Sequence, residues 1–371
     1  MRDLIKVYQN SIIKQASVKK KNKKWVIVCD KGVISLDAFQ PLSDVSNWVK
    51  TESLFPTDVD YKMANQICYF KGKYYVSTKS KYLFVSEDLT NWTAKALDRT
   101  DYYYTCIACN NEVLIIGFNT TLMWSTDGEN WTTKDFGVTV SNSSSSYGIA
   151  DIEWCEKYNY FFFNYRTQQV RAIEFTGDDL VLRKDLVVET SNLNQNCETF
   201  VRMDFSGVPI VGITYEGRPI VYSDGELKKL DQFTSSGTTG TYSRYRCAFN
   251  FELDYPDLSR PVVSLGALGK EYYGDYTKIL SQNSPSIETD RAIPNHYKYS
   301  NNTFQDYKTY TGFADWDLND TILVLFKYKQ CNVFSKYTLA HASTNGYWGG
   351  YNGIITTTIG NMVAVKCLEV D

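Results

Sequence analysis

Two pairs of carboxylates have a spacing that suits chemistry. Asp151 and Glu153 lie two residues apart in Ala-Asp-Ile-Glu-Trp, and Asp315 and Asp317 have the same spacing in Phe-Ala-Asp-Trp-Asp. Residues i and i+2 of a β-strand project from one face, so each pair would place two carboxylates side by side. Such a pair can hydrolyse a glycosidic bond, bind a cation or another ligand, or serve only structure and solvation. We favour the structural interpretation and keep these four residues as candidates.

Other chemistries find little support in the chain. His296 and His341 are its only histidines, too few for a multi-histidine metal site. No glycine-rich nucleotide loop, Gly-x-Ser-x-Gly or His-Glu-x-x-His motif occurs. Cys106 and Cys109 have the spacing of a redox or zinc motif, but no second pair accompanies them and their segment alternates like a strand. We therefore predict no metal and no cofactor, and a core position for both thiols.

Charge and hydropathy exclude several partners. The chain of 371 residues carries 39 basic and 42 acidic side chains, so no global field attracts nucleic acid or an acidic membrane. Its longest apolar stretches, such as residues 26–29 and 322–326, are far shorter than the roughly 20 residues of a membrane-spanning helix. The basic run at residues 19–24 directly precedes a predicted strand. We expect a solvated hairpin turn there, with nucleic-acid or phosphate contact as the alternative.

The nine cysteines and the beginning of the chain indicate a cellular setting. The cysteines are odd in number and spread evenly, which does not suit a disulfide framework, so most should be reduced and buried. The first residues lack the apolar core and cleavage site of a secretory signal. Both features predict folding in a cytosol.

A repeat organises these residues. Residues 71–93 align without a gap on residues 110–132, and a weaker copy occupies residues 24–48. Each copy predicts an apolar strand, a turn, a second and a third strand, and a tight Ser-x-Asp turn that enters a fourth strand at Trp. Four antiparallel strands in about 40 to 45 residues is the period of a propeller blade.

The sequence therefore predicts an all-β fold, a β-propeller of four-stranded antiparallel blades, with seven blades and six as the alternative. We assign residues 1–371 to this single domain. The two ends of the chain, near residues 4–8 and 362–368, both look like strands, and we expect them to close the ring by pairing. Later blades are expected around residues 158–165, 208–214, 260–266 and 320–326, with polar loops at 141–146, 234–240 and 281–286 between blades.

The Ser-x-Asp turn resembles the Asp-box, or BNR repeat, of sialidase-type β-propellers and of many phage and bacterial surface proteins. The full pattern occurs once, at residues 125–131, and a degenerate fragment lies at 343–348. The residues that carry the resemblance are Ser43, Asp44, Trp48, Ser86, Asp88, Trp92, Ser125, Asp127, Gly128, Trp131, Ser223, Asp224 and Gly225.

The residue types of this turn suit a stabilising role. Asp and Ser accept hydrogen bonds from turn amides, Gly permits a positive φ, and Trp covers the hairpin. In the family the Asp-box lies at the blade periphery, away from the axial binding site. The resemblance therefore implies a structural role for Asp127, with a functional role as the alternative.

A sialidase activity is not carried over from the resemblance. That enzyme needs an arginine triad, a tyrosine activated by a glutamate, and an acid/base aspartate. The chain has no early Arg-Ile-Pro element, its pairs Arg218-Pro219 and Arg260-Pro261 lie late, and Arg2 is the only arginine in its first 98 residues. A general two-carboxylate glycosidase is harder to exclude, because Asp151 and Glu153 fall in a predicted innermost strand.

We therefore expect a non-enzymatic binding disc. Tyrosine is abundant, with 29 residues, and its amphipathic ring suits contact with carbohydrate or protein. Together with the missing secretion signal, the resemblance suggests a phage virion protein, made in the host cytoplasm and associated with the tail or fibre. Its expected partners are other virion proteins or a host-surface polysaccharide, and a homo-oligomer within the assembly is possible; no nucleic acid and no membrane insertion are expected. The alternatives are a polysaccharide depolymerase on the same propeller and a purely structural tail scaffold.

Overall fold

The computed structural model describes the chain in segments: residues 22–37, 48–61, 63–99, 105–118, 121–136, 149–156, 158–165, 169–189, 197–202, 210–214, 219–223, 225–229, 248–252, 261–265, 270–273, 314–316, 321–326, 330–335 and 353–371. These segments contain strands and turns only. None of them offers a helix that is long and apolar enough to cross a membrane.

Four-stranded antiparallel sheets are the unit of the fold. The first sheet has the order β27 (Met362–Val370), β1 (Asn22–Cys29), β2 (Gly32–Asp37) and β3 (Val49–Leu54). The second sheet is β4 (Ala64–Phe70), β5 (Lys73–Thr78), β6 (Tyr82–Ser86) and β7 (Thr93–Ala96). The third is β8 (Thr105–Cys109), β9 (Leu114–Phe118), β10 (Thr121–Ser125) and β11 (Thr132–Asp135). The fourth is β12 (Ile149–Cys155), β13 (Tyr160–Tyr165), β14 (Gln169–Phe175) and β15 (Leu180–Glu189).

The later sheets follow the same plan with one irregularity. The last sheet is β23 (Ala314–Trp316), β24 (Thr321–Phe326), β25 (Gln330–Ser335) and β26 (Gly353–Thr356). Between it and the fourth lies a seven-stranded sheet of β16 (Cys197–Arg202), β17 (Ile210–Thr214), β18 (Pro219–Ser223), β19 (Glu226–Lys229), β20 (Ala248–Glu252), β21 (Pro261–Leu265) and β22 (Lys270–Tyr273). Parallel pairing of β16 with β20 joins its two antiparallel groups, so the number of separate blades stays a prediction.

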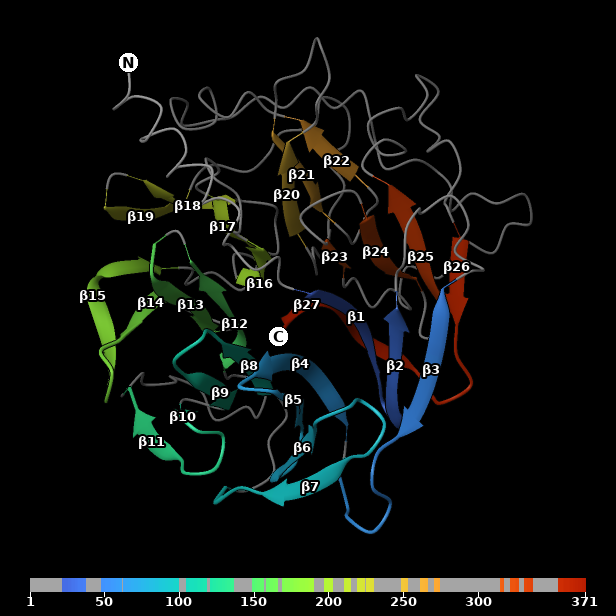
Figure 1. The fold of residues 1–371 in the computed structure, drawn as a ribbon. Coiled ribbons are helices and arrows are strands. Elements are labelled where there is room, and N and C mark those ends of the chain that lie inside the picture. The colour runs from blue at the N-terminus through green and yellow to red at the C-terminus, as the bar shows by residue number, and fades with distance from the viewer. Residues whose placement is uncertain are drawn as a thin grey trace, which may run out of the picture.

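The sheets are arranged around a common axis, which confirms the predicted all-β propeller fold (Figure 1). Among the described strands, the first of each group contacts the first of the next in a closed circuit of β27, β4, β8, β12, β16, β20, β23 and again β27. We call these the inner strands. The C-terminal end of the chain lies near the centre of the ring (Figure 1).

Pairing of β27 with β1 joins distant parts of the chain. The register runs from Asn22 opposite Val370 to Cys29 opposite Met362. The N-terminal strand expected at residues 4–8 lies outside the described residues. Of the basic run, Lys23 and Lys24 belong to β1 rather than to a turn, and Lys24 Nζ lies 2.6 Å from Asp37 Oδ1, whereas residues 19–21 lie outside the described residues.

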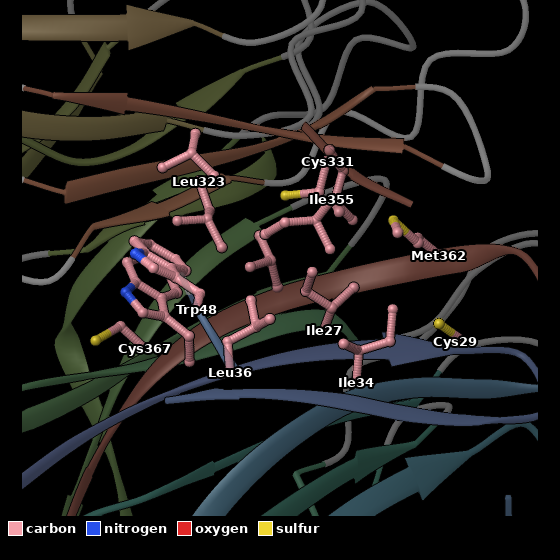
Figure 2. Close-up of a cluster of buried hydrophobic side chains, with 14 residues drawn as sticks. Ile27, Cys29, Ile34, Leu36, Trp48, Leu323, Cys331, Ile355, Met362 and Cys367 are labelled. Atoms are coloured by element: carbon pink, nitrogen blue, oxygen red, sulfur yellow. The ribbon is translucent and has the colours of Figure 1, made fainter. Parts of the chain in front are cut away.

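Strands β1, β2, β5, β8 and β9 are buried on both faces, which explains why they are apolar runs rather than alternating ones, whereas the outer strands β3, β7 and β11 are largely exposed. On β1, Trp25 and Ile27 join a core cluster shared with the last sheet, whereas Val26 and Val28 join a cluster shared with the second sheet. Figure 2 shows the first of these clusters, where side chains of β1 and β2 meet Leu323 and the other side chains of the last sheet.

Most cysteines belong to these cores, as predicted. The structure describes seven of them as free thiols, six of which are buried. Burial raises the pKa of the Cys29 thiol to about 12 and that of Cys106 well above its ordinary range. These thiols therefore remain protonated and act as small apolar side chains.

The seam between the first and last sheets should dominate stability. Replacing the fully buried Ile27 with alanine (Ile27→Ala) should lower the free energy of unfolding by about 2–5 kcal/mol, because it leaves a cavity in the seam. Val49→Ala is the matched control, since Val49 is 57% exposed on β3 of the same sheet, and it should change stability by about 0.5 kcal/mol at most. Denaturant unfolding checks both; equal losses would contradict the assignment of the seam.

Candidate functional site

The turn between β6 and β7 is organised by Ser86 and Asp88. Asp88 Oδ1 accepts hydrogen bonds from the backbone N–H groups of Thr90 at 2.8 Å and Asn91 at 2.7 Å, and Oδ2 accepts one from the Asn91 side-chain amide at 2.8 Å. Ser86 Oγ accepts the N–H of Leu89 at 2.9 Å and donates to Asp88 Oδ1 at 3.1 Å. The polar groups of the turn therefore satisfy one another.

The turn between β10 and β11 repeats this arrangement. Asp127 Oδ1 accepts the N–H groups of Glu129 and Asn130, both at 2.7 Å, and Oδ2 accepts the Asn130 side-chain amide at 2.7 Å. Ser125 Oγ accepts the N–H of Gly128 at 2.8 Å and donates to Asp127 Oδ1 at 2.9 Å. The two copies aligned in the sequence thus have the same hydrogen bonds in space.

The two aspartates are committed to their turns as anions. Hydrogen bonds from Asn91 lower the pKa of Asp88 far below its usual value, and hydrogen bonds from Asn130 do the same for Asp127. A carboxyl group held in this state cannot donate a proton at neutral pH. The geometry therefore gives these aspartates a structural role.

The residue that follows the aspartate differs between the two turns. Leu89 has a φ of 62° and Gly128 a φ of 76°, both in the left-handed region. The Leu89 side chain is buried in the core between the first and second sheets. Gly128 has no room for a side chain, because a Cβ added to it would overlap the hydroxyl of Tyr75 from the second sheet.

The tryptophans that follow the turns differ in burial. Trp92 is buried, and its indole N–H donates to Ser53 Oγ at 3.0 Å and to the Leu89 carbonyl at 3.3 Å. Trp48 is buried in the core between the first and last sheets. Trp131 is half-buried and packs against the core between the second and third sheets.

The structure describes the other predicted turns only in part. Ser43 and Asp44 lie outside the described residues, as does the fragment at 343–348. Ser223 is the last residue of β18, and Gly225 has the positive φ of a turn, 78°. Asp224 lies outside the described residues.

The fourth strands of the first three sheets, β3, β7 and β11, are their outer strands. A side chain from each donates a hydrogen bond to a backbone carbonyl of the following sheet, a feature that the sequence did not predict. Ser53 Oγ on β3 donates to the Leu89 carbonyl at 2.6 Å. Lys95 Nζ on β7 donates to the Gly128 carbonyl at 3.1 Å. Lys134 Nζ on β11 donates to the Leu180 carbonyl, where β15 begins, at 2.7 Å. We call these three contacts the outer attachments. Only the folded topology brings their partners together.

The carboxylates Asp151 and Glu153 lie on β12, one of the inner strands. Asp151 Oδ1 accepts hydrogen bonds from Gln66 Nε2 at 2.9 Å and from the Ile152 N–H at 3.0 Å. Glu153 Oε2 forms an ion pair with Lys366 Nζ at 2.9 Å. We call Gln66, Asp151, Glu153 and Lys366 the axial cluster.

The axial cluster reaches across the inner circuit. Lys366 is on β27 and Glu153 on β12, with β4 and β8 between these strands in the circuit. Gln66 on β4 passes β8, where its Oε1 accepts the Ile107 N–H at 3.1 Å, and binds Asp151 beyond it. Polar side chains thus join inner strands that are not neighbours in the circuit, and both carboxylates already have partners from other sheets. A glycosidase instead needs its carboxylates aimed at a substrate in an open site.

The second predicted pair is only partly described. Asp315 lies on β23, opposite Leu323 of β24 in the ladder, and Asp317 lies outside the described residues. Cys106 and Cys109 lie on β8, as their alternation predicted; Cys109 Sγ donates to the Tyr69 carbonyl at 3.0 Å. Among the described residues, no three metal-ligating side chains come together.

Gly128 should tolerate substitution poorly. Gly128→Ala adds a Cβ that overlaps Tyr75 at a positive φ, so the free energy of unfolding should fall by about 2 kcal/mol or more. Gly72→Ala is the control: its φ is 81°, but nothing lies within 4 Å of the new Cβ, so the loss should be about 1 kcal/mol. Chemical denaturation measures both, and an equal loss would exclude the Tyr75 overlap as a cause.

The turn aspartates should make stability depend on pH. Their pKa values are depressed in the folded state from an ordinary 3.8, so their contribution is present above that pH and lost as pH falls below it. Denaturant midpoints at pH 7 and pH 3 should therefore differ less for Asp88→Asn/Asp127→Asn than for the unaltered protein. The same drop in both proteins would show that other groups cause the acid sensitivity.

Comparison with known proteins gives a likeness of fold alone. No family model matches the chain, and no curated protein matches it. Among solved structures, the computationally designed Ika8 protein has a TM-score of 0.50 at 8% identity, covering 93% of this chain and 91% of that chain. The dihydro-heme d1 dehydrogenase NirN in complex with DHE has a TM-score of 0.48 at 11% identity, covering 88% and 62%. YCF48 bound to D1 peptide has a TM-score of 0.44 at 10% identity, covering 73% and 77%.

Proposed function

We propose that this protein is a non-enzymatic Asp-box β-propeller of a phage virion, associated with the tail or fibre, that binds a host-surface glycan. The paired turns at Ser86–Asp88 and Ser125–Asp127 support the Asp-box part of this proposal, because each uses Ser and Asp to hold the turn amides. The protein would be made in the host cytoplasm and would meet its partners as part of the virion, alone or as a homo-oligomer.

The axial cluster carries the non-enzymatic part of the proposal. Asp151 and Glu153 are the described carboxylates best placed for glycoside hydrolysis, and Gln66 and Lys366 from other sheets each bind one of their oxygens. Glu153 and Lys366 have side chains only 22% and 28% exposed, so a sugar would have to break this pair to reach them. A propeller that only binds a ligand on its surface can leave the Glu153–Lys366 ion pair intact.

An array of bacterial surface polysaccharides tests the proposal. The purified protein should be retained on one or more polysaccharides without releasing reducing ends. Asp151→Asn/Glu153→Gln should be retained equally well, because these carboxylates take no part in binding. Retained protein and released reducing ends are read on the same spots.

Other outcomes identify the alternatives. Release of reducing ends that Asp151→Asn/Glu153→Gln abolishes, with the melting temperature maintained, would establish a depolymerase. No retention on any polysaccharide would overturn glycan binding. Co-sedimentation with phage tails would then distinguish a structural scaffold that docks other virion proteins.

A further inference from the structure

Three tyrosines gather at the junction between the fourth sheet and β18. Tyr158 lies in the turn that joins β12 to β13, Tyr160 begins β13, and Tyr222 is on β18. The rings of Tyr158 and Tyr222 meet edge to face with centroids 4.5 Å apart, and those of Tyr160 and Tyr222 do so at 6.1 Å. Such edge-to-face contacts fix the ring orientations.

Arg183 on β15 completes the group. Its guanidinium carbon lies 5.0 Å from the centroid of the Tyr160 ring, and Nη1 donates to the Tyr160 hydroxyl. Nη2 donates to Asp185 Oδ2 at 2.8 Å, and Glu174 Oε2 lies 3.6 Å from Nη1. A cation, two carboxylates and aromatic rings thus share one small area.

We call Tyr158, Tyr160, Tyr222, Arg183, Asp185 and Glu174 the tyrosine–arginine cluster. Its rings rest on a buried core, and its carboxylates are exposed to solvent. All three tyrosines are half-buried and pack against a core of fully buried side chains that includes Phe162 and Leu186. The two carboxylates are the exposed part of the group, 39% for Glu174 and 59% for Asp185, whereas the Arg183 side chain is 29% exposed. The core therefore holds the rings while the carboxylates face solvent.

The polar groups of β15 are used differently from those of the earlier outer strands. Ser53, Lys95 and Lys134 each bind a turn of the following sheet. Arg183 on β15 instead binds Asp185, Glu174 and Tyr160, which all belong to its own sheet. Arg183 therefore does not connect its sheet to the next one, as the outer attachments do, and the cluster lies at the junction of the two sheets.

We propose that the tyrosine–arginine cluster is a carbohydrate-binding surface that takes a hexose unit of a polysaccharide. This inference rests on the proposed glycan-binding function and names the surface that would perform it. The C–H face of a sugar ring would pack on the part of the half-buried Tyr158 and Tyr160 rings that stays open to solvent. Its hydroxyls, which both donate and accept hydrogen bonds, would bind Arg183 and Asp185 together.

The mixture of charges selects this ligand over others. A phosphate group would meet the carboxylates of Asp185 and Glu174 beside the single guanidinium, which disfavours nucleic acid and phosphorylated ligands. A purely apolar peptide side chain would remove water from these ions without replacing its hydrogen bonds. A neutral polyhydroxylated ring satisfies donor and acceptor at once, so its binding should depend little on salt.

Two variants test the surface against a matched pair elsewhere. Arg183→Met removes the guanidinium but keeps an apolar stem, and Tyr158→Ala removes one ring. Each should weaken retention on the bound polysaccharide by about tenfold or more. Lys81→Met and Tyr82→Ala are the controls, because Lys81 Nζ lies 5.4 Å from the centroid of the half-buried Tyr82 ring in another cation–π pair. They should retain the affinity of the unaltered protein.

The outcomes separate this inference from the proposed function. If the unaltered protein binds a polysaccharide and the Arg183 and Tyr158 variants bind it equally well, the surface is wrong and glycan binding stands. If the unaltered protein binds none, both proposals fail. Should a variant unfold, hydroxyl-radical footprinting of the unaltered protein with its polysaccharide decides: protection of Tyr158, Tyr160 and Tyr222 but not of Tyr82 supports the surface, and the reverse overturns it.

Discussion

The fold depends on one constraint, which is that every sheet must cover both of its faces with a neighbouring sheet. A four-stranded sheet with two apolar faces is insoluble alone, and a row of such sheets still leaves two faces open at its ends. Closing the row into a ring is what covers the last two faces. The pairing of β27 with β1 provides this closure by placing a C-terminal strand in the sheet of the first described strands. The core that Figure 2 shows, between β1 and the last sheet, exists only because the ring is closed.

This constraint also separates support from function. The residues that stand out in the sequence, Asp88 and Asp127 above all, hold turns, and the axial carboxylates Asp151 and Glu153 bridge inner strands. Both sets of polar groups hold parts of the architecture together. The tyrosine–arginine cluster differs because its rings are supported by the core while its carboxylates, Glu174 and Asp185, are more exposed than Glu153 of the axial cluster. A binding surface of this kind gains rigidity from the fold without interrupting it.

Sequence reasoning found what is local and missed what is not. The Ser-x-Asp turns, the strand at Cys106 and the apolar segments of later sheets follow from patterns within a few residues, and the repeat of such units indicates a propeller. The partners of Asp151 and Glu153 could not be predicted, because Gln66 and Lys366 are 85 and 213 positions away. The meeting of Tyr222 with Tyr158 likewise depends on how neighbouring sheets pack, which no local pattern encodes.

The difference between Leu89 and Gly128 decides whether the two repeats could replace each other. The turns have the same hydrogen bonds, yet the residue that follows the aspartate has different surroundings in each. Leu89 of the first turn extends its side chain into the core between the first and second sheets. At the same position of the second turn, Gly128 leaves the space that Tyr75 of the second sheet fills. An exchange of the two segments would bring a leucine against that tyrosine. The two repeats are therefore not interchangeable, although each folds into the same four-stranded unit.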